Sequence, residues 1–117
     1  MIANQRIQQI NEVIKQELNQ IILREVEFDF GSLVTITRTK TDPELKITKI
    51  FFRVFPEDKE KKCLRIFKKR SPFLQSLLNK KVILRYVPQI KFFIDTEIKG
   101  EEEKEERIEE LFRKIEG

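Results

Sequence analysis

Ten basic side chains and no acidic one occupy the run from Lys61 to Lys91, in a chain whose residues are 38% charged. The ten are Lys61, Lys62, Arg65, Lys68, Lys69, Arg70, Lys80, Lys81, Arg85 and Lys91. Charges of one sign repel one another, so the run favours a polyanionic ligand, in which each neutralised phosphate releases condensed counterions. The alternative is a solvated basic helix face without a ligand.

Local periodicity places many of these cations on one helix face. At about 100° per residue, the basic positions from Lys61 to Lys69 fall within roughly a third of the helical circle, opposite Cys63 and Phe67. The pair Ser71-Pro72 predicts that this helix stops and that a new one starts at Pro72, with Ser71 as its N-cap. The free N–H groups of a new helix would make a notch that attracts phosphate.

Residues with the chemistry of an enzyme are scarce. The chain has no histidine, and its single cysteine, Cys63, is expected to be a small core residue. The glutamates at 101–103 are typical of a solvated tail rather than of a metal site, which needs converging oxygens. The chain also lacks the glycine patterns that bind nucleotides. We therefore expect no catalysis, cofactor, metal or small-molecule substrate.

Length and charge suggest one domain with a distinct tail. The 117 residues suit a single compact domain. Residues 1–96 hold 19 Lys/Arg and 11 Asp/Glu, a net charge of +8, whereas residues 97–117 hold 5 and 9, a net charge of −4. The tail can form an amphipathic helix through Ile108, Leu111, Phe112 and Ile115. No run is apolar enough for a membrane span or a secretion signal, so we expect a cytoplasmic protein that does not bind membranes.

The remaining patterns predict an α+β domain. Residues 4–24 repeat apolar side chains at helical spacing, namely Ile7, Ile10, Val13, Ile14, Leu18, Ile21 and Ile22. Strands are predicted at 33–41 and 46–55, joined by a turn at Asp42-Pro43 into an antiparallel hairpin. Helices over 57–70 and 72–81 follow, then a strand at 82–87 that continues in extended form over 90–95. The predicted order is α-β-β-α-kink-α-β, a three-stranded sheet covered by helices on one face, plus the C-terminal acidic helix.

These segments together resemble the ribosome-binding factor A family. The similarity rests on VTIT at 34–37, DPEL at 42–45, SPFLQSLL at 71–78 and LRYVPQIKFFID at 84–95. It implies a KH-like fold of the second type and binding to the small ribosomal subunit near the decoding-region rRNA; separately, we expect a monomer. It also implies a role in late maturation of the rRNA 5′ end and in growth at low temperature. Ser71-Pro72 replaces the Ala-x-Gly kink of the family, and the GXXG loop of ordinary KH domains is absent.

The expected interface combines the resemblance with the charge pattern. We predict phosphate contacts from the cations of the basic run and a kink set by Ser71 and Pro72. The predicted phosphate contacts are Lys62, Arg65, Lys68, Lys69, Arg70, Lys80, Lys81 and Arg85. Gln75 and Asn79 are the side chains there that look suited to reading bases. Two alternatives are a general KH-like RNA-binding module and a protein-interaction domain that uses an open strand edge or the tail helix.

Overall fold

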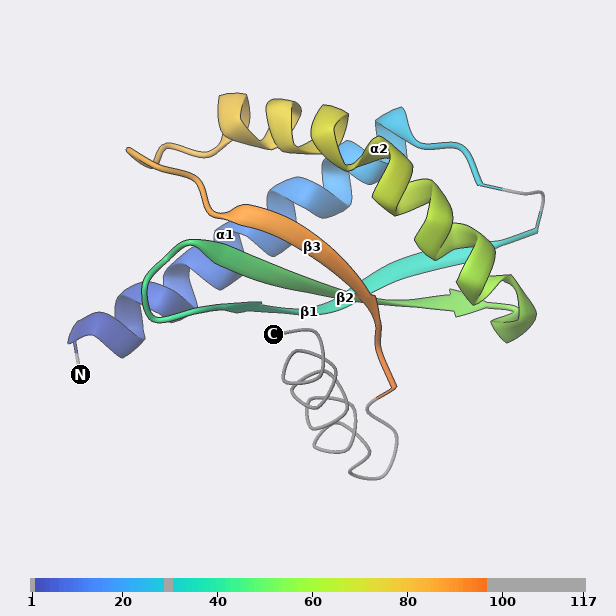
Figure 1. Ribbon diagram of the computed structural model, residues 1–117, viewed down its shortest axis with the longest axis horizontal. Helices are drawn as coiled ribbons and strands as arrows, with labels where there is room; N and C mark the ends of the chain where they lie inside the picture. Colours follow the sequence, from blue (N-terminus) through green and yellow to red (C-terminus); the bar gives the residue numbers. More distant parts are fainter. Residues whose placement is uncertain (1, 29–30, 97–117) are drawn as a thin grey trace, which may run out of the picture.

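The computed structural model describes residues 2–28 and 31–96. Along the chain lie α1 (Ile2–Glu25), β1 (Leu33–Thr41), β2 (Ile47–Phe55), the short 3-10 helix η1 (Glu57–Lys59), α2 (Glu60–Lys81) and β3 (Gln89–Ile94). The strands form one sheet in the order β1-β2-β3, and α1 and α2 lie on the same face of it (Figure 1). This layout confirms the predicted α+β fold. The tail helix predicted around Ile108 lies outside the described residues.

The first helix is confirmed, with its apolar stripe against the sheet. Ile14, Leu18 and Ile21 have no exposed surface, and Ile10 is 6% exposed. Val13 is instead 43% exposed because the stripe is narrower than predicted and leaves this position at its edge. Burying side chains of this size stabilises the fold by about 1.5–3 kcal/mol each.

The predicted hairpin is also confirmed. β1 and β2 pair antiparallel, from Leu33 opposite Phe55 to Thr41 opposite Thr48. The Asp42 carbonyl accepts a hydrogen bond from the Leu45 N–H at 3.0 Å, which closes a turn around the intervening proline. The Asp42 carboxylate accepts the Lys46 N–H at 2.8 Å, so the aspartate holds the turn from both its backbone and its side chain.

The third strand differs from its prediction. β3 pairs parallel with β2 only from Gln89, which lies opposite Ile47, to Ile94. The predicted strand at 82–87 is wrong, since this segment is an irregular loop in which the Leu84 N–H bonds the Val82 carbonyl at 3.0 Å. Ile47 is the first residue of β2, so residues before Gln89 would face the hairpin turn rather than a strand. The extended form predicted for 90–95 is confirmed.

Phe67 of α2 lies at the centre of the core. Its ring is fully buried and stacks on Phe92 at a centroid distance of 4.4 Å. Phe52 and Phe28 meet it edge-on at 4.7 and 5.3 Å. Cys63, one helical turn earlier, is 2% exposed, as predicted for a core residue. The three elements α2, β2 and β3 therefore meet at one aromatic cluster.

Asp95 fastens the end of β3 to the sheet. Its N–H donates to the Phe52 carbonyl at 2.7 Å, and its carboxylate accepts the hydroxyl of Thr37. Thr37 occupies an irregularity in the β1–β2 register, which releases it from regular pairing and turns its hydroxyl toward Asp95. The Arg38 guanidinium lies 3.6 Å from the same carboxylate. The strand beside α2 is thus held at a fixed position.

Candidate nucleic-acid interface

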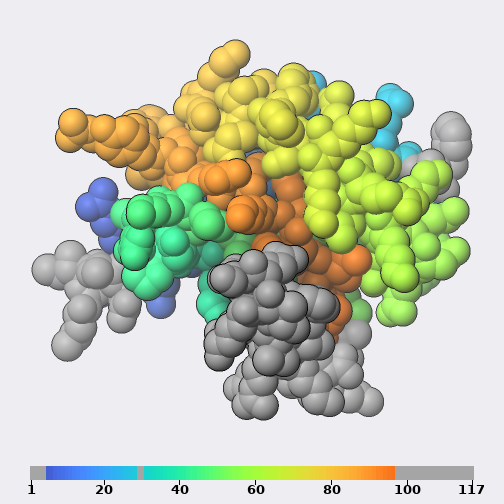
Figure 2. Space-filling view, viewed as in Figure 1, coloured from blue at the N-terminus to red at the C-terminus, as the bar shows by residue number. Residues whose placement is uncertain are grey.

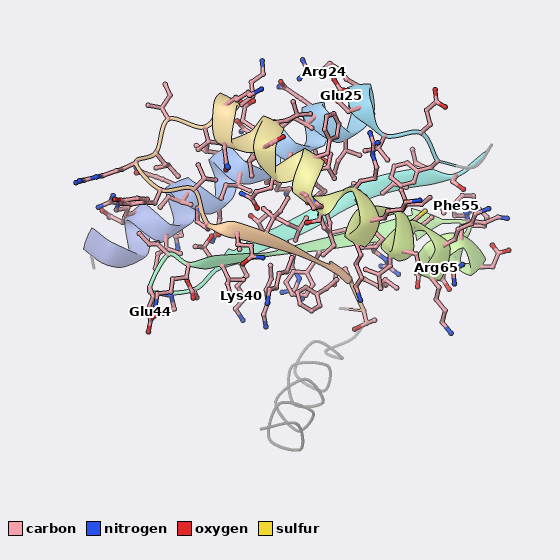
Figure 3. The ribbon with its side chains drawn as sticks, turned by 45° about the horizontal axis from the view of Figure 1, so that its top comes forward. Arg24, Glu25, Lys40, Glu44, Phe55 and Arg65 are labelled. Atoms are coloured by element: carbon pink, nitrogen blue, oxygen red, sulfur yellow. The ribbon has the colours of Figure 1, made fainter. Side chains whose placement is uncertain are left out.

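The outer face of α2 is basic and exposed. Cys63, Phe67, Leu74 and Leu78 recur at helical spacing and are buried against the sheet, so the positions opposite them face water. The basic side chains that are exposed on this helix are Lys61, Lys62, Arg65, Lys68, Lys69, Arg70, Lys80 and Lys81. Figure 3 shows Arg65 pointing outward from α2. The sequence-based assignment of a core face and a basic face is confirmed.

The structure corrects the prediction of two separate helices. α2 runs unbroken from Glu60 to Lys81 with Pro72 inside it, although Figure 1 shows the helix changing direction near its middle. Proline has no N–H to bond the Lys68 carbonyl, and its ring pushes that carbonyl away, which bends a helix without ending it. Ser71 is therefore not an N-cap, and the predicted phosphate notch at a new helix N-terminus is wrong.

A groove runs between α2 and the edge strand β3. It has a volume of about 440 Å³, and its apolar lining includes Leu64 and Phe93. Lys68 and Lys91 stand on its rim and Ser71 is half-buried in its wall. Within the described residues β3 pairs on one side only, with β2. The groove thus offers cations, apolar surface and unpaired backbone groups to an extended ligand.

The predicted contact residues form two groups along α2 rather than one notch. Lys62, Arg65, Lys68 and Lys69 lie before the bend, whereas Lys80 and Lys81 lie at the end of the helix. Arg85 follows in the loop 82–88. Lys62 and Lys80 are separated by roughly 27 Å of helix, at about 1.5 Å per residue. A stripe of this length can follow several phosphates in succession.

Arg70 has a structural partner. Its guanidinium donates to the Glu25 carbonyl at the end of α1, at 3.2 Å, and lies 4.7 Å from the centre of the Phe73 ring. A cation that satisfies a free carbonyl at a helix C-terminus also interacts favourably with the helix dipole. Arg70 therefore joins α1 to α2 and has a role in the fold itself.

Gln75, interpreted from the sequence as a possible base reader, is engaged within the fold. Its amide nitrogen donates to the Pro88 carbonyl at 3.1 Å and to Asn79 at 3.0 Å, and its amide oxygen accepts the Ile90 N–H at 2.8 Å. These bonds hold the start of β3 against α2. Sequence periodicity could not reveal them, because they depend on where residues 88–90 return to the helix.

Replacing Gln75 by alanine is expected to destabilise the protein by about 1–3 kcal/mol. The change leaves the Pro88 carbonyl and the Ile90 N–H without their partner at a partly buried site. Urea denaturation followed by circular dichroism measures the change. Asn79→Ala is the matched control, since Asn79 is exposed and its side-chain oxygen accepts a hydrogen bond from Gln75. Equal midpoints for the Gln75 variant and the unchanged protein would contradict the assignment.

The only acidic residue of α2 is the first one, Glu60. Burial raises the pKa of its carboxyl group, the nearby Glu57 carboxylate raises it further, and Arg53 opposes the shift. A raised pKa means that the ionised form is disfavoured at this position. Glu60 is also one acid against eight basic residues in α2, so it offsets little of the positive charge along the helix.

Features of other kinds of site are absent from the described part of the chain. Residues 2–28 and 31–96 contain no group of three histidine, cysteine or acidic side chains arranged to hold a metal ion. In the same residues, no helix is both long enough and apolar enough to cross a membrane. The exposed cations of α2 and the groove beside it remain the distinctive surface.

In a comparison with known proteins, the similar sequences share one name. Ribosome-binding factor A of Coxiella burnetii is 30% identical over 95 residues, which cover 81% of this chain and 80% of that protein. The Halothermothrix orenii protein of the same name is 29% identical over 115 residues, 97% of this chain and 91% of the relative.

Solved structures agree on the fold. The crystal structure of ribosome-binding factor A from Thermus thermophilus matches with a TM-score of 0.67 at 18% identity, covering 75% of this chain and 93% of that one. A T. thermophilus model fitted into a cryo-EM map of a 30S complex matches with a TM-score of 0.57, also at 18% identity, over 69% of this chain and 86% of that one. The sequence model of the family, described as ribosome-binding factor A, matches residues 6–112. The chain therefore belongs to the ribosome-binding factor A family.

Proposed function

We propose that this protein is a non-enzymatic assembly factor that binds the rRNA of the small ribosomal subunit. It acts as a monomer during late maturation, when the rRNA 5′ end is processed, and supports growth at low temperature. The relative from T. thermophilus was fitted into a 30S complex, which supports the choice of subunit. The observation that carries the proposal is the stripe of exposed cations along α2, a helix whose single acid is its first residue.

Phosphate contacts are assigned to the solvent-facing cations. The group before the bend is Lys62, Arg65, Lys68 and Lys69, and the group after it is Lys80, Lys81 and Arg85. Ser71 and Pro72 set the bend that orients the two groups, and Arg70 fixes α2 to α1. Lys91, on the groove rim, joins the set. Residues 1–96 form the RNA-binding domain, and residues 97–117 are a separate acidic segment.

Co-sedimentation tests the proposal. The protein is centrifuged with purified small subunits, large subunits and naked small-subunit rRNA over a series of salt concentrations. Retention on small subunits alone, with affinity falling steeply as salt rises, is the expected result. Equal binding to all three would reduce the function to general RNA binding. No binding at low salt would favour a protein-interaction domain and overturn the proposal.

A further inference from the structure

Beyond the basic stripe, the loop 82–88 exposes large side chains that the charge pattern did not identify. Ile83 is 100% exposed and Tyr86 is 77% exposed, between two well-buried residues, Val82 and Pro88. Figure 2 shows this loop protruding from the body beyond the end of α2. An exposed aromatic ring on a projecting loop has little role in the core of the fold, so its surroundings indicate what it could bind.

The loop is held at both ends, and at its start the Val82 N–H donates to the Leu78 carbonyl at 2.9 Å. Its last residue, Pro88, is fully buried, and its carbonyl accepts a hydrogen bond from Gln75 at 3.1 Å. The next residue, Gln89, donates its N–H to the Lys46 carbonyl at 2.9 Å. Tyr86 therefore sits on a supported loop, and presenting its ring to a ligand needs little ordering on binding.

A hollow of about 370 Å³ lies between this loop, α1 and the hairpin turn. Ligand pockets in proteins span roughly 300–1,000 Å³, so this hollow suits a small planar group. Its apolar lining includes Ile10, Leu84 and Pro88, and Tyr86 also lines it. The hollow therefore combines apolar surface with one aromatic residue.

The hollow carries positive charge. Arg6, Lys46 and Arg85 line it together with a single acid, Glu44. The Glu44 carboxylate pairs with the Lys46 ammonium at 3.1 Å, with both side chains at least 70% exposed, which leaves two arginines. The Arg85 guanidinium lies 5.6 Å from the centre of the Tyr86 ring. The ring itself stays largely exposed, so a second flat group can stack on it.

We infer that the hollow beside Tyr86 binds an unpaired nucleobase of RNA, stacked on the tyrosine ring, with Arg6 and Arg85 meeting the adjacent phosphates. Every base has a flat face that stacks on an aromatic side chain, and the arginines supply charge complementarity to the backbone. Lys80 and Lys81 connect the hollow to the basic stripe of α2. The inference rests on the proposed function and deepens it, because it adds single-stranded RNA to the phosphate contacts.

The test compares two fluorescently labelled RNAs with the same stem. In the first RNA the stem is closed by a loop of unpaired bases. In the second RNA the two strands are fully paired and are joined by a linker without bases. Affinities are measured for the unchanged protein and for Tyr86→Ala, Tyr86→Phe and Phe55→Ala. Tyr86→Ala is expected to weaken binding of the RNA with unpaired bases by about 5- to 150-fold, the range for losing one stacked base. Tyr86→Phe keeps the stacking face, and Phe55, 72% exposed on β2, is the matched aromatic control. Both should bind normally.

Two further readouts separate stacking from charge. Tyr86→Ala should leave the salt dependence of binding and the affinity for the paired RNA unchanged, because no phosphate contact is lost. In addition, the chain has one tyrosine and no tryptophan, so its intrinsic emission reports on Tyr86 alone. The unpaired RNA should quench this emission more than the paired RNA does. Equal affinity of Tyr86→Ala and the unchanged protein for the unpaired RNA would overturn the inference.

The outcome for the hollow is distinguishable from that for the proposed function. If Tyr86→Ala binds the unpaired RNA normally while the unchanged protein still sediments with small subunits alone, the stacking site is wrong and the assembly function stands. In the opposite case, the unchanged protein shows no preference for small subunits, but Tyr86→Ala binds the RNA with unpaired bases more weakly than the unchanged protein does. The stacking site is then supported and the proposed ribosomal role is wrong.

Discussion

Charge reversal of Arg65 and Lys69 to glutamate is expected to lower the affinity for small ribosomal subunits by on the order of 100-fold at about 0.1 M salt. Both side chains are exposed on the outer face of α2, one helical turn apart. Each lost phosphate contact lowers the slope of log affinity against log salt by about one, so two contacts correspond to roughly two powers of ten at this salt concentration. Arg70 is left unchanged because its bond to the Glu25 carbonyl also supports the fold.

Binding measured over a salt series, together with a melting curve, checks this prediction. The matched control is Lys15→Glu with Lys40→Glu, which changes the net charge equally on α1 and β1. Figure 3 shows Lys40 on the sheet, away from Arg65. The control should lose only a small part of the affinity, through the weaker field of the whole molecule. Equal losses in both variants would mean that net charge, and not the face of α2, controls binding.

Replacing Phe67 by alanine is expected to destabilise the protein by about 3–5 kcal/mol. The ring is fully buried and meets aromatic side chains from β2 and β3 and from the segment after α1. Its removal leaves a cavity that these rigid rings cannot fill. For a domain of this size the melting temperature should fall by roughly 10–20 °C.

Denaturation in urea at low temperature measures the loss, since the variant retains only part of a total stability of about 5–15 kcal/mol. Phe55→Ala is the control, because Phe55 is 72% exposed and lies at the end of β2, as labelled in Figure 3. It should cost less than about 1 kcal/mol. A similar cost for both variants would show that the aromatic cluster around Phe67 does not dominate the core.

Elements with strong local signals could be predicted from the sequence. The apolar ladder from Ile10 to Ile21 has a helical period, and the turn at Asp42 combines a proline with an aspartate that bonds the following N–H groups. In both cases the residues that define the element lie close together in the sequence. For this helix and this turn, local propensity and tertiary packing favour the same structure, so the sequence alone is enough to predict it.

The predictions for two segments were wrong because contacts with residues distant in the sequence determine their structure. Pro72 predicts a helix break from local sterics, but Phe67 and Leu74 on either side of it both belong to the same buried core. Packing against the sheet keeps the helix continuous and leaves a bend. The segment 82–87 has strand-forming residues, yet the register of β2 with β3 gives it no partner strand.

The candidate site was predictable to a similar degree. The run of cations and their helix face could be derived from spacing alone. The roles of Arg70 and Gln75, in contrast, follow from what the fold brings next to them, namely the end of α1 and the start of β3. The hollow beside Tyr86 combines three segments distant in the sequence, so no local pattern could indicate it.

The parallel pairing of β2 with β3 also makes the groove depend on residues far apart in the sequence. The β1–β2 hairpin joins residues that are close in sequence, whereas β3 pairs with β2 only after the chain returns across the length of α2, and such long-range pairing costs more loop-closure entropy. The groove between α2 and β3, with Lys68 and Lys91 on its rim, therefore exists only once this pairing has formed. A partly folded copy would offer the basic helix without the groove, so a ligand that needs both discriminates in favour of fully folded protein.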